Sequence, residues 1–265
     1  MPTQEENVTD LEIRLRSVLR RITAAANRAD RDPARVRLVA VTKTQPLSLI
    51  TAAYELGLRH FGENRVEEAA GKVAALPPDI VWHMIGHIQS RKAKQVIPLF
   101  HFVHSVDSLR LALRLDRLSS QRPEPLPVLL EFNVSGEHGK SGFPAAHWSE
   151  DRAQRQVLLT YIQQIVALPH LKVEGLMTIA PIVAQAEQAR PFFACLRKLR
   201  DELISLFPES GWSHLSMGMT DDFEVAIEEG ASIVRIGRAI FAPEQPEAGW
   251  QPPGTNPGPA CTILR

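Results

Sequence analysis

Lys43 is the side chain in this sequence with the clearest potential for covalent chemistry. It lies in the stretch VRLVAVTKTQP (36–46), whose apolar, β-branched residues predict a strand buried on both faces. An ammonium group at the end of such a strand is costly to desolvate unless the amine is neutral or covalently engaged. Lys43 is therefore a candidate nucleophile. The alternative is a solvated lysine on the rim of the fold, as most lysines are.

Polar or polarisable side chains also stand at the ends of later strand-like runs. Parallel strands bring their carboxyl ends to one edge, so we expect these side chains to gather around Lys43; they are Asn64, His83, Asn133, Met177, Ser216 and Arg235. Each also has a plainer interpretation. Asn64 can cap the next helix, His83 can be a core histidine bonded to a backbone carbonyl, and Met177 can simply fill the core.

Two glycine-containing turns, SMGMT (216–220) and GRA (237–239), follow the last two strand-like runs. Turns at these places in a barrel commonly bind phosphate, because glycine lets backbone N–H groups approach its oxygens. Ser216 can add its hydroxyl. Asp221 and Asp222 oppose a phosphate by their charge and would have to point away from it. The alternative is that these are ordinary turn glycines.

Arg235 stands in the apolar run SIVRIG (232–237). Period-two alternation places Ile233, Arg235 and Gly237 on one face of the strand. A guanidinium directed into a barrel needs an acceptor, because it does not release its proton. That acceptor is either an acidic neighbour in a buried salt bridge or an atom of a ligand.

A strand-end lysine, a phosphate-binding turn and a buried arginine together favour one ligand. Pyridoxal 5′-phosphate has an aldehyde for the amine, a phosphate for the turns and a ring nitrogen that can accept a hydrogen bond from arginine.

The elements that must position these side chains alternate between strand and helix about eight times. This alternation predicts a single-domain α/β fold, a (β/α)8 barrel, preceded by an extra N-terminal helix that Thr9 or Asp10 can cap. A doubly wound open sheet is the alternative, although no G-x-G-x-x-G turn follows the first strand. The expected strands are 36–46, 59–64, 80–86, 100–106, 126–135, 171–180, 213–218 and 232–237; the expected helices are 11–29, 47–57, 65–75, 89–97, 107–120, 149–168, 185–207 and 221–229, with a long loop at 136–147.

The 265 residues carry 30 basic and 30 acidic side chains, a balance that favours neither nucleic acid nor an anionic membrane as a partner. The two cysteines, Cys195 and Cys261, cannot build a disulfide framework, and we see no signal peptide and no membrane-length apolar run. We therefore expect a cytoplasmic protein, with a monomer as the default. The expected organisation is an N-terminal segment (1–10), a barrel domain (11–242) and a Pro-rich tail (243–265) predicted to be disordered.

Over about residues 11–242 the sequence closely resembles the pyridoxal-phosphate homeostasis proteins, the YggS/PROSC family. The motifs that carry the resemblance are AVTKTQP, HFGENRVEE, WHMIGHIQ, NVSGEHGKSGF, GLMTIAP, HLSMGMTDDFEVAIEEGA and VRIGRAIF. The resemblance implies a TIM barrel of the alanine-racemase N-terminal type (fold type III), with the cofactor held as an internal aldimine on Lys43 and its ring nitrogen facing Arg235. It further implies phosphate ligands at Ser216, Gly218 and Gly237, and a ring lined by Asn64, His83, Met177 and Met217.

The sequence departs from the family pattern at Arg91, where asparagine is usual, at Arg238, where threonine or serine is frequent, and at Ala242, where glycine is usual. These departures concern loop details. Family members are regarded as carriers or regulators of the cofactor pool, with recipient apo-enzymes as partners and without robust turnover.

Two enzymatic alternatives stay open. The first is a small amino-acid racemase with Lys43 as its base, although an arginine at the ring nitrogen weakens the electron sink and both tyrosines, Tyr54 and Tyr161, fall in helices expected outside the barrel. The second is a barrel enzyme in which Lys43 attacks the carbonyl of a phosphorylated sugar. Lys140, in the loop near the barrel mouth, is either a secondary amine for handing on the cofactor or a solvated lysine.

Overall fold

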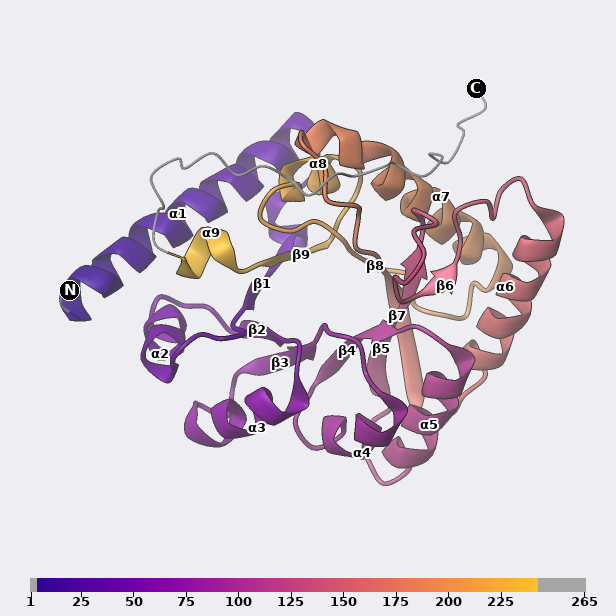
Figure 1. Cartoon of the computed structure of the whole chain (residues 1–265), viewed down its shortest axis with the longest axis horizontal. Coiled ribbons are helices and arrows are strands. Elements are labelled where there is room, and N and C mark those ends of the chain that lie inside the picture. Colours follow the sequence, from indigo (N-terminus) through magenta and orange to yellow (C-terminus); the bar gives the residue numbers. More distant parts are fainter. Residues whose placement is uncertain (1–3, 243–265) are drawn as a thin grey trace.

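The apolar runs of the chain form a closed barrel of eight parallel strands surrounded by helices (Figure 1). The computed structural model describes residues 4–242. Each barrel strand pairs in parallel with the next, and the last pairs with the first through Val39 and Arg235. The barrel prediction is thus confirmed and the open-sheet alternative is wrong. The barrel strands are β1 (Arg37–Val41), β2 (His60–Glu63), β3 (Val81–Met84), β4 (Phe102–Val106), β5 (Leu126–Asn133), β7 (Leu171–Met177), β8 (His214–Ser216) and β9 (Ile233–Ile236).

Helices follow most strands and cover the outside of the barrel, because their apolar faces need the apolar outer surface of the strands. They are α1 (Gln4–Arg28), α2 (Leu47–Glu55), α3 (Val66–Ala75), α4 (Ala93–Val96), α5 (Leu109–Ser119), α6 (Arg152–Val166), α7 (Arg190–Leu206), α8 (Phe223–Glu228) and α9 (Arg238–Phe241), with short 3₁₀ turns at Pro33–Arg35, Ser90–Lys92 and Ala186–Ala189. In the described part of the chain, no helix is long and apolar enough to cross a membrane.

The N-terminal helix starts earlier than expected. Residues 4–10 are already helical, so a cap at Thr9 or Asp10 is wrong, while the division into an N-terminal segment (1–10) and a barrel domain (11–242) stays a prediction. Residues 4–10 contain neither proline nor glycine to interrupt the helix. On its apolar face Leu19 is 44% exposed, whereas the other members are buried; these are Leu11, Leu15, Val18, Ile22 and Ala26. The expected disordered tail (243–265) lies outside the described residues.

Some element boundaries also differ from the expected ones. The first strand stops at Val41 instead of continuing to residue 46, and Pro46 is the N-cap residue of α2 and not its first helical residue. The helix expected to start at Asp107 starts at Leu109, and Ser108 caps it by accepting a hydrogen bond from the N–H of Leu111. The loop expected at 136–147 contains a two-residue strand, β6 (Phe143–Pro144), which pairs with the end of β5.

The barrel interior is a small core of its own, separate from the larger core between strands and helices. Successive strand residues point to opposite faces, so every second residue faces the interior. The interior apolar cluster consists of Val39, Phe102, Leu129, Met177 and Ile233. Polar side chains on the same faces of the strands then lie near one another, although they are far apart in the sequence.

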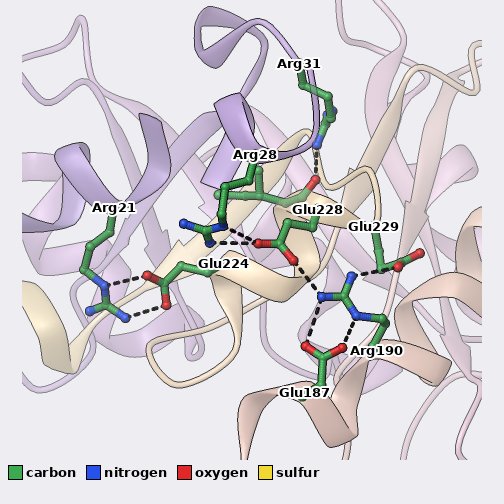
Figure 2. Close-up of polar contacts among 9 residues, drawn as sticks. Arg21, Arg28, Arg31, Glu187, Arg190, Glu224, Glu228 and Glu229 are labelled. Atoms are coloured by element: carbon green, nitrogen blue, oxygen red, sulfur yellow. Dashed lines mark hydrogen bonds and ion pairs between the residues drawn. The ribbon is translucent and has the colours of Figure 1, made fainter. Parts of the chain in front are cut away.

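A ladder of arginine–glutamate pairs joins α1, α7 and α8 on the outside of the barrel (Figure 2). Arg21 binds both carboxylate oxygens of Glu224 and lies over the ring of Phe223. Glu228 is bound by Arg28 and Arg190 at 2.7 Å and 2.6 Å. These partly buried, two-pronged contacts are stronger than isolated surface pairs. They fix α8, which begins directly after the glycine-containing turn at 216–220.

Candidate cofactor site

Lys43 lies in a tight turn at the carboxyl end of β1. The N–H of Gln45 donates to the carbonyl oxygen of Thr42 at 3.0 Å, and Thr44 adopts φ = 64°. This left-handed conformation is strained for a β-branched residue. Lys43 is exposed to solvent, so the expectation that a buried strand forces its amine out of water is wrong. Its predicted position, above the carboxyl end of the first strand, is nevertheless correct.

A buried lysine holds this turn from below. The Lys72 ammonium donates to the carbonyl oxygen of Thr42 at 2.7 Å, to Glu63 at 2.7 Å and to Glu68 at 2.6 Å. Glu68 in turn accepts the N–H of the strained Thr44. Glu63 is fully buried, and burial raises the pKa of its carboxyl group despite the bonds from Lys72 and Thr42. The sequence analysis missed this cluster, whose only signal was the Glu68–Lys72 spacing on a helix.

Arg235 is buried inside the barrel without an acidic partner. It donates to the hydroxyl oxygen of Ser216 at 2.7 Å and to the carbonyl oxygen of Thr178 at 2.9 Å. Because no ion pair to Arg235 exists within residues 4–242, the salt-bridge alternative is wrong. Burial lowers the pKa of Arg235 to about 10, with Asp222 and Glu131 acting weakly in the other direction. The guanidinium therefore stays charged at neutral pH and can still interact with a ligand.

The two glycine turns pack more closely against their neighbours than side-chain-bearing turns could. Gly218 has φ = 93°, and a Cβ atom there would lie 2.6 Å from the Cβ of Ala226 and 2.8 Å from the Cα of Phe223. A Cβ on Gly237 would lie 3.2 Å from the carbonyl oxygen of Val41. Only glycine fits at 218, so this residue is more than an ordinary turn glycine. A turn that only glycine permits is thus present at the carboxyl end of the barrel, and its binding of phosphate stays a prediction.

Of the two aspartates beside this turn, Asp221 is engaged outside it and Asp222 binds the backbone of the turn itself. Asp221 pairs with Arg238, and both side chains are largely exposed. Asp222 accepts the N–H of Met219 at 2.6 Å, and burial raises the pKa of its carboxyl group. Arg238, one of the departures from the family pattern, is thus neutralised by Asp221.

His83 is the middle member of a hydrogen-bonded row of histidines. Its two ring nitrogens contact His60 at 2.9 Å and His104 at 2.8 Å, and His104 contacts the Ser216 hydroxyl at 2.9 Å. The plainer interpretation was right that His83 is a core histidine but wrong about its partner, which is not a backbone carbonyl. With both nitrogens used, His83 can contact a ligand only through its ring carbons. His60 and His104 were missed, although His104 follows the inward alternation of β4.

The other predicted ring-lining residues occupy different surroundings. Asn64 is half-buried after β2, and the capping alternative is wrong because Arg65 occupies the N-cap of α3. Met177 belongs to the interior cluster of the barrel. Met217 packs in the outer core, so any contact with a ligand in the barrel mouth would come from its backbone. Their predicted role around the cofactor ring stays a prediction.

Asn133 organises the long loop after β5. Its side-chain amide donates to the carbonyl oxygen of Glu137 at 3.0 Å, and its side-chain oxygen accepts the N–H of Gly136 at 2.9 Å. Lys140 is ion-paired with Glu137 and lies 3.5 Å from the carbonyl oxygen of Ile179, after β7. Asn133 therefore serves the loop, and the role of Lys140 in passing on a cofactor stays a prediction.

Glu131 is a buried carboxyl group that the sequence analysis missed. It lies in β5 beside Met177 of β7 and has no hydrogen-bond partner within the described residues. Burial raises its pKa to about 7, Asp107 adds to the shift, and Arg235 and His87 oppose it. The signal in the sequence was a single acid in the apolar run LPVLLEFN, on the same face as Leu129. The interior thus contains a group that titrates near neutral pH.

We predict that Lys72→Met destabilises the protein by about 3 to 5 kcal/mol, because Glu63 then keeps a buried charge without a partner. The double variant Lys72→Met/Glu63→Gln should recover at least half of the loss. Urea unfolding measures the free energy of unfolding of both variants. Lys92→Met, which breaks an exposed ion pair with Glu67, is the matched control and should lower the free energy of unfolding by roughly 0.5 kcal/mol or less. Unchanged unfolding of the single variant would contradict the role of this cluster.

We also predict that Glu131→Gln stabilises the protein increasingly as the pH rises from 5 to 8. A folded pKa of about 7 against an ordinary 4.5 means that the carboxyl group favours folding below pH 4.5 and loses this contribution between pH 4.5 and 7. The gap between variant and wild type should widen by about 2 to 3 kcal/mol in urea unfolding at the two pH values. Exposed Glu150→Gln should show no widening, and a constant gap for Glu131→Gln would refute the assignment.

Comparison with known proteins places this chain in a family. The family model described as "Alanine racemase, N-terminal domain" matches residues 13–245. A Pyridoxal phosphate homeostasis protein from Pseudomonas aeruginosa is 43% identical over 245 residues, covering 91% of this chain and 96% of the relative. One from Aquifex aeolicus is 41% identical over 229 residues, covering 86% and 96%.

A solved structure supports the same relationship. PipY of Synechococcus elongatus, solved with PLP bound, is 34% identical, with a TM-score of 0.71 and coverage of 88% of this chain and 100% of that one. Sequence and fold therefore agree along nearly the whole described barrel. The chain belongs to the alanine racemase N-terminal domain family and, within it, to the pyridoxal phosphate homeostasis proteins.

Proposed function

We propose that this chain binds pyridoxal 5′-phosphate at the carboxyl end of the barrel and takes part in cofactor homeostasis as a cytoplasmic monomer without robust turnover. The observation that carries the proposal is the buried Arg235, which is bonded to Ser216 next to the Gly218 turn and has no acidic partner in the described residues. A relative of the same fold has been solved with PLP bound.

The residues present fit this cofactor. Ser216 and the backbones of Gly218 and Gly237 would hold the phosphate, and Arg235 would face the ring nitrogen. Lys43 supplies a solvated primary amine that can condense with an aldehyde, with release of one water. When bound, the cofactor supplies an electrophilic aldehyde and an electron-accepting ring. Asn64, His83, Met177 and Met217 complete the proposed surroundings of the ring.

The same residues support holding the cofactor more than turning over an amino acid. A charged arginine donates to the ring nitrogen and leaves it unprotonated, which weakens the ring as an electron sink. Tyr54 lies on α2 and contacts Asp79, and Tyr161 on α6 is 38% exposed, so neither tyrosine within residues 4–242 reaches the interior as a second base. Recipient apo-enzymes are the proposed partners.

We predict that purified protein supplied with pyridoxal 5′-phosphate turns yellow, and that borohydride reduction and peptide mapping place the pyridoxyl adduct on Lys43. Lys140→Ala, the matched loop variant, should retain the adduct on Lys43. An adduct on another lysine would overturn the assignment of Lys43. A colourless protein that takes up no cofactor would overturn the proposed function, and the phosphorylated-sugar alternative would then take first place.

The racemase alternative has its own test. We expect no more than slow exchange of the α-hydrogen of free alanine in deuterium oxide when the cofactor-loaded protein is present, because the ring is a weak electron sink. Proton NMR follows the loss of the α-hydrogen signal. Rapid exchange that disappears in Lys43→Ala would establish an enzyme and refute the carrier proposal.

A further inference from the structure

A row of three histidines crosses the barrel interior and ends at the proposed phosphate ligand. His60 Nδ1 lies 2.9 Å from His83 Nε2, His83 Nδ1 lies 2.8 Å from His104 Nε2, and His104 Nδ1 lies 2.9 Å from Ser216 Oγ. The row runs from the first residue of β2 to the last residue of β8. His83 and His104 are fully buried, whereas His60 is only half-buried.

All three histidines are neutral. Burial lowers the pKa values of His83 and His104 well below 6.5, and the charge of Arg235 adds to the effect on His104. Burial also lowers the pKa of His60 to about 4, with a contribution from Arg37. A neutral imidazole has one donor and one acceptor nitrogen, so each ring in the row passes on the direction of the hydrogen bond that it receives.

Arg235 and Ser216 determine that direction. Arg235 only donates, so the Ser216 oxygen accepts its N–H and has a single proton left to give. If Ser216 gives this proton to His104 Nδ1, then His104, His83 and His60 must all carry their proton on Nε2. If Ser216 gives it to another acceptor, His104 must donate from Nδ1 to keep its bond, and all three rings then carry their proton on Nδ1.

We infer that His104, His83 and His60 are positioning residues that reverse their tautomers together when Ser216 stops donating to His104 and donates to a phosphate oxygen of the bound ligand. The inference rests on the proposed function, because it takes the ligand to be pyridoxal 5′-phosphate. Both states contain the same number of protons and preserve every hydrogen bond of the row. Ser216 passes its proton to His104 Nδ1 and takes another from solvent for the phosphate, each Nε2 proton passes to Nδ1 of the next ring, and His60 Nε2 releases one proton to water. Ser216 can therefore become a donor to the ligand without leaving a buried nitrogen unpaired.

The half-buried end of the row makes the reversal feasible. His60 Nε2 has no partner within the described residues, so water can accept from it in one state and donate to it in the other. A matched reference is also built into the fold. His101 Nδ1 accepts the N–H of Trp82 at 3.0 Å, which holds His101 in the Nε2–H tautomer whatever occupies the site.

The test is nitrogen NMR of protein labelled with ¹⁵N in its histidine rings, recorded at pH 8 with and without pyridoxal 5′-phosphate. We expect the signals of His60, His83 and His104 to change from the Nε2–H to the Nδ1–H pattern when the cofactor binds, while the His101 signals stay unchanged. Absorption of the same sample reports cofactor binding independently. In Ser216→Ala loaded with the cofactor, the three rings should not reverse.

The outcomes separate the two proposals. Bound cofactor with unchanged tautomers of His83 and His104 overturns the inference alone. Reversal that persists in cofactor-loaded Ser216→Ala also overturns it, because the hydroxyl is then not the group that the row responds to. A protein that takes up no cofactor overturns the proposed function and this inference with it.

Discussion

The interior of the barrel depends on one buried cation, the guanidinium of Arg235. Bringing such a charge out of water costs several kcal/mol unless its N–H groups are bonded, and Ser216 and Thr178 supply acceptors. Because no carboxylate neutralises it in the described structure, its positive charge acts on every neighbour. It helps to keep His104 neutral and partly offsets the raised pKa of Glu131. A ligand with an acceptor at this point would meet a charge already held in place.

A second buried cation, Lys72, plays a different part at the rim. Its ammonium group is ion-paired with Glu63 and Glu68, so its positive charge is not available to a ligand. Its bonds hold the turn that carries Lys43, including the strained Thr44 next to it. The exposed amine of Lys43 is thus carried by a turn with several hydrogen bonds, although its own side chain has no hydrogen bond or ion pair among residues 4–242. Arg235 thus provides a charge inside the barrel, whereas Lys72 holds a turn at its rim.

The glycine turn after β8 is held from both sides. On the inner side, the N–H of Arg235 donates to the carbonyl oxygen of Gly218 at 3.0 Å. On the outer side, α8 follows the turn and is tied to α1 and α7 by the ladder of Figure 2. The extra N-terminal helix therefore supports the helix that follows the glycine turn, which is the turn proposed to bind phosphate.

The sequence by itself determined the barrel, because alternating apolar strands and amphipathic helices bury their apolar faces when the strands form a parallel barrel inside a ring of helices. It also placed Lys43, Ser216 and Arg235 toward the same end of the barrel. It also identified the turn at Gly218, since glycine signals a close backbone approach. It could not show that β1 stops at Val41 or that Lys72 lies beneath the turn that carries Lys43. Both features depend on contacts between residues far apart in the chain, such as the bond from Lys72 to the carbonyl oxygen of Thr42. Only the tertiary structure decided that the three histidines form a row and that Glu131 has no hydrogen-bond partner among the described residues. Their chemistry depends on which inward-facing side chains meet across the barrel, and the stagger of the strands sets that.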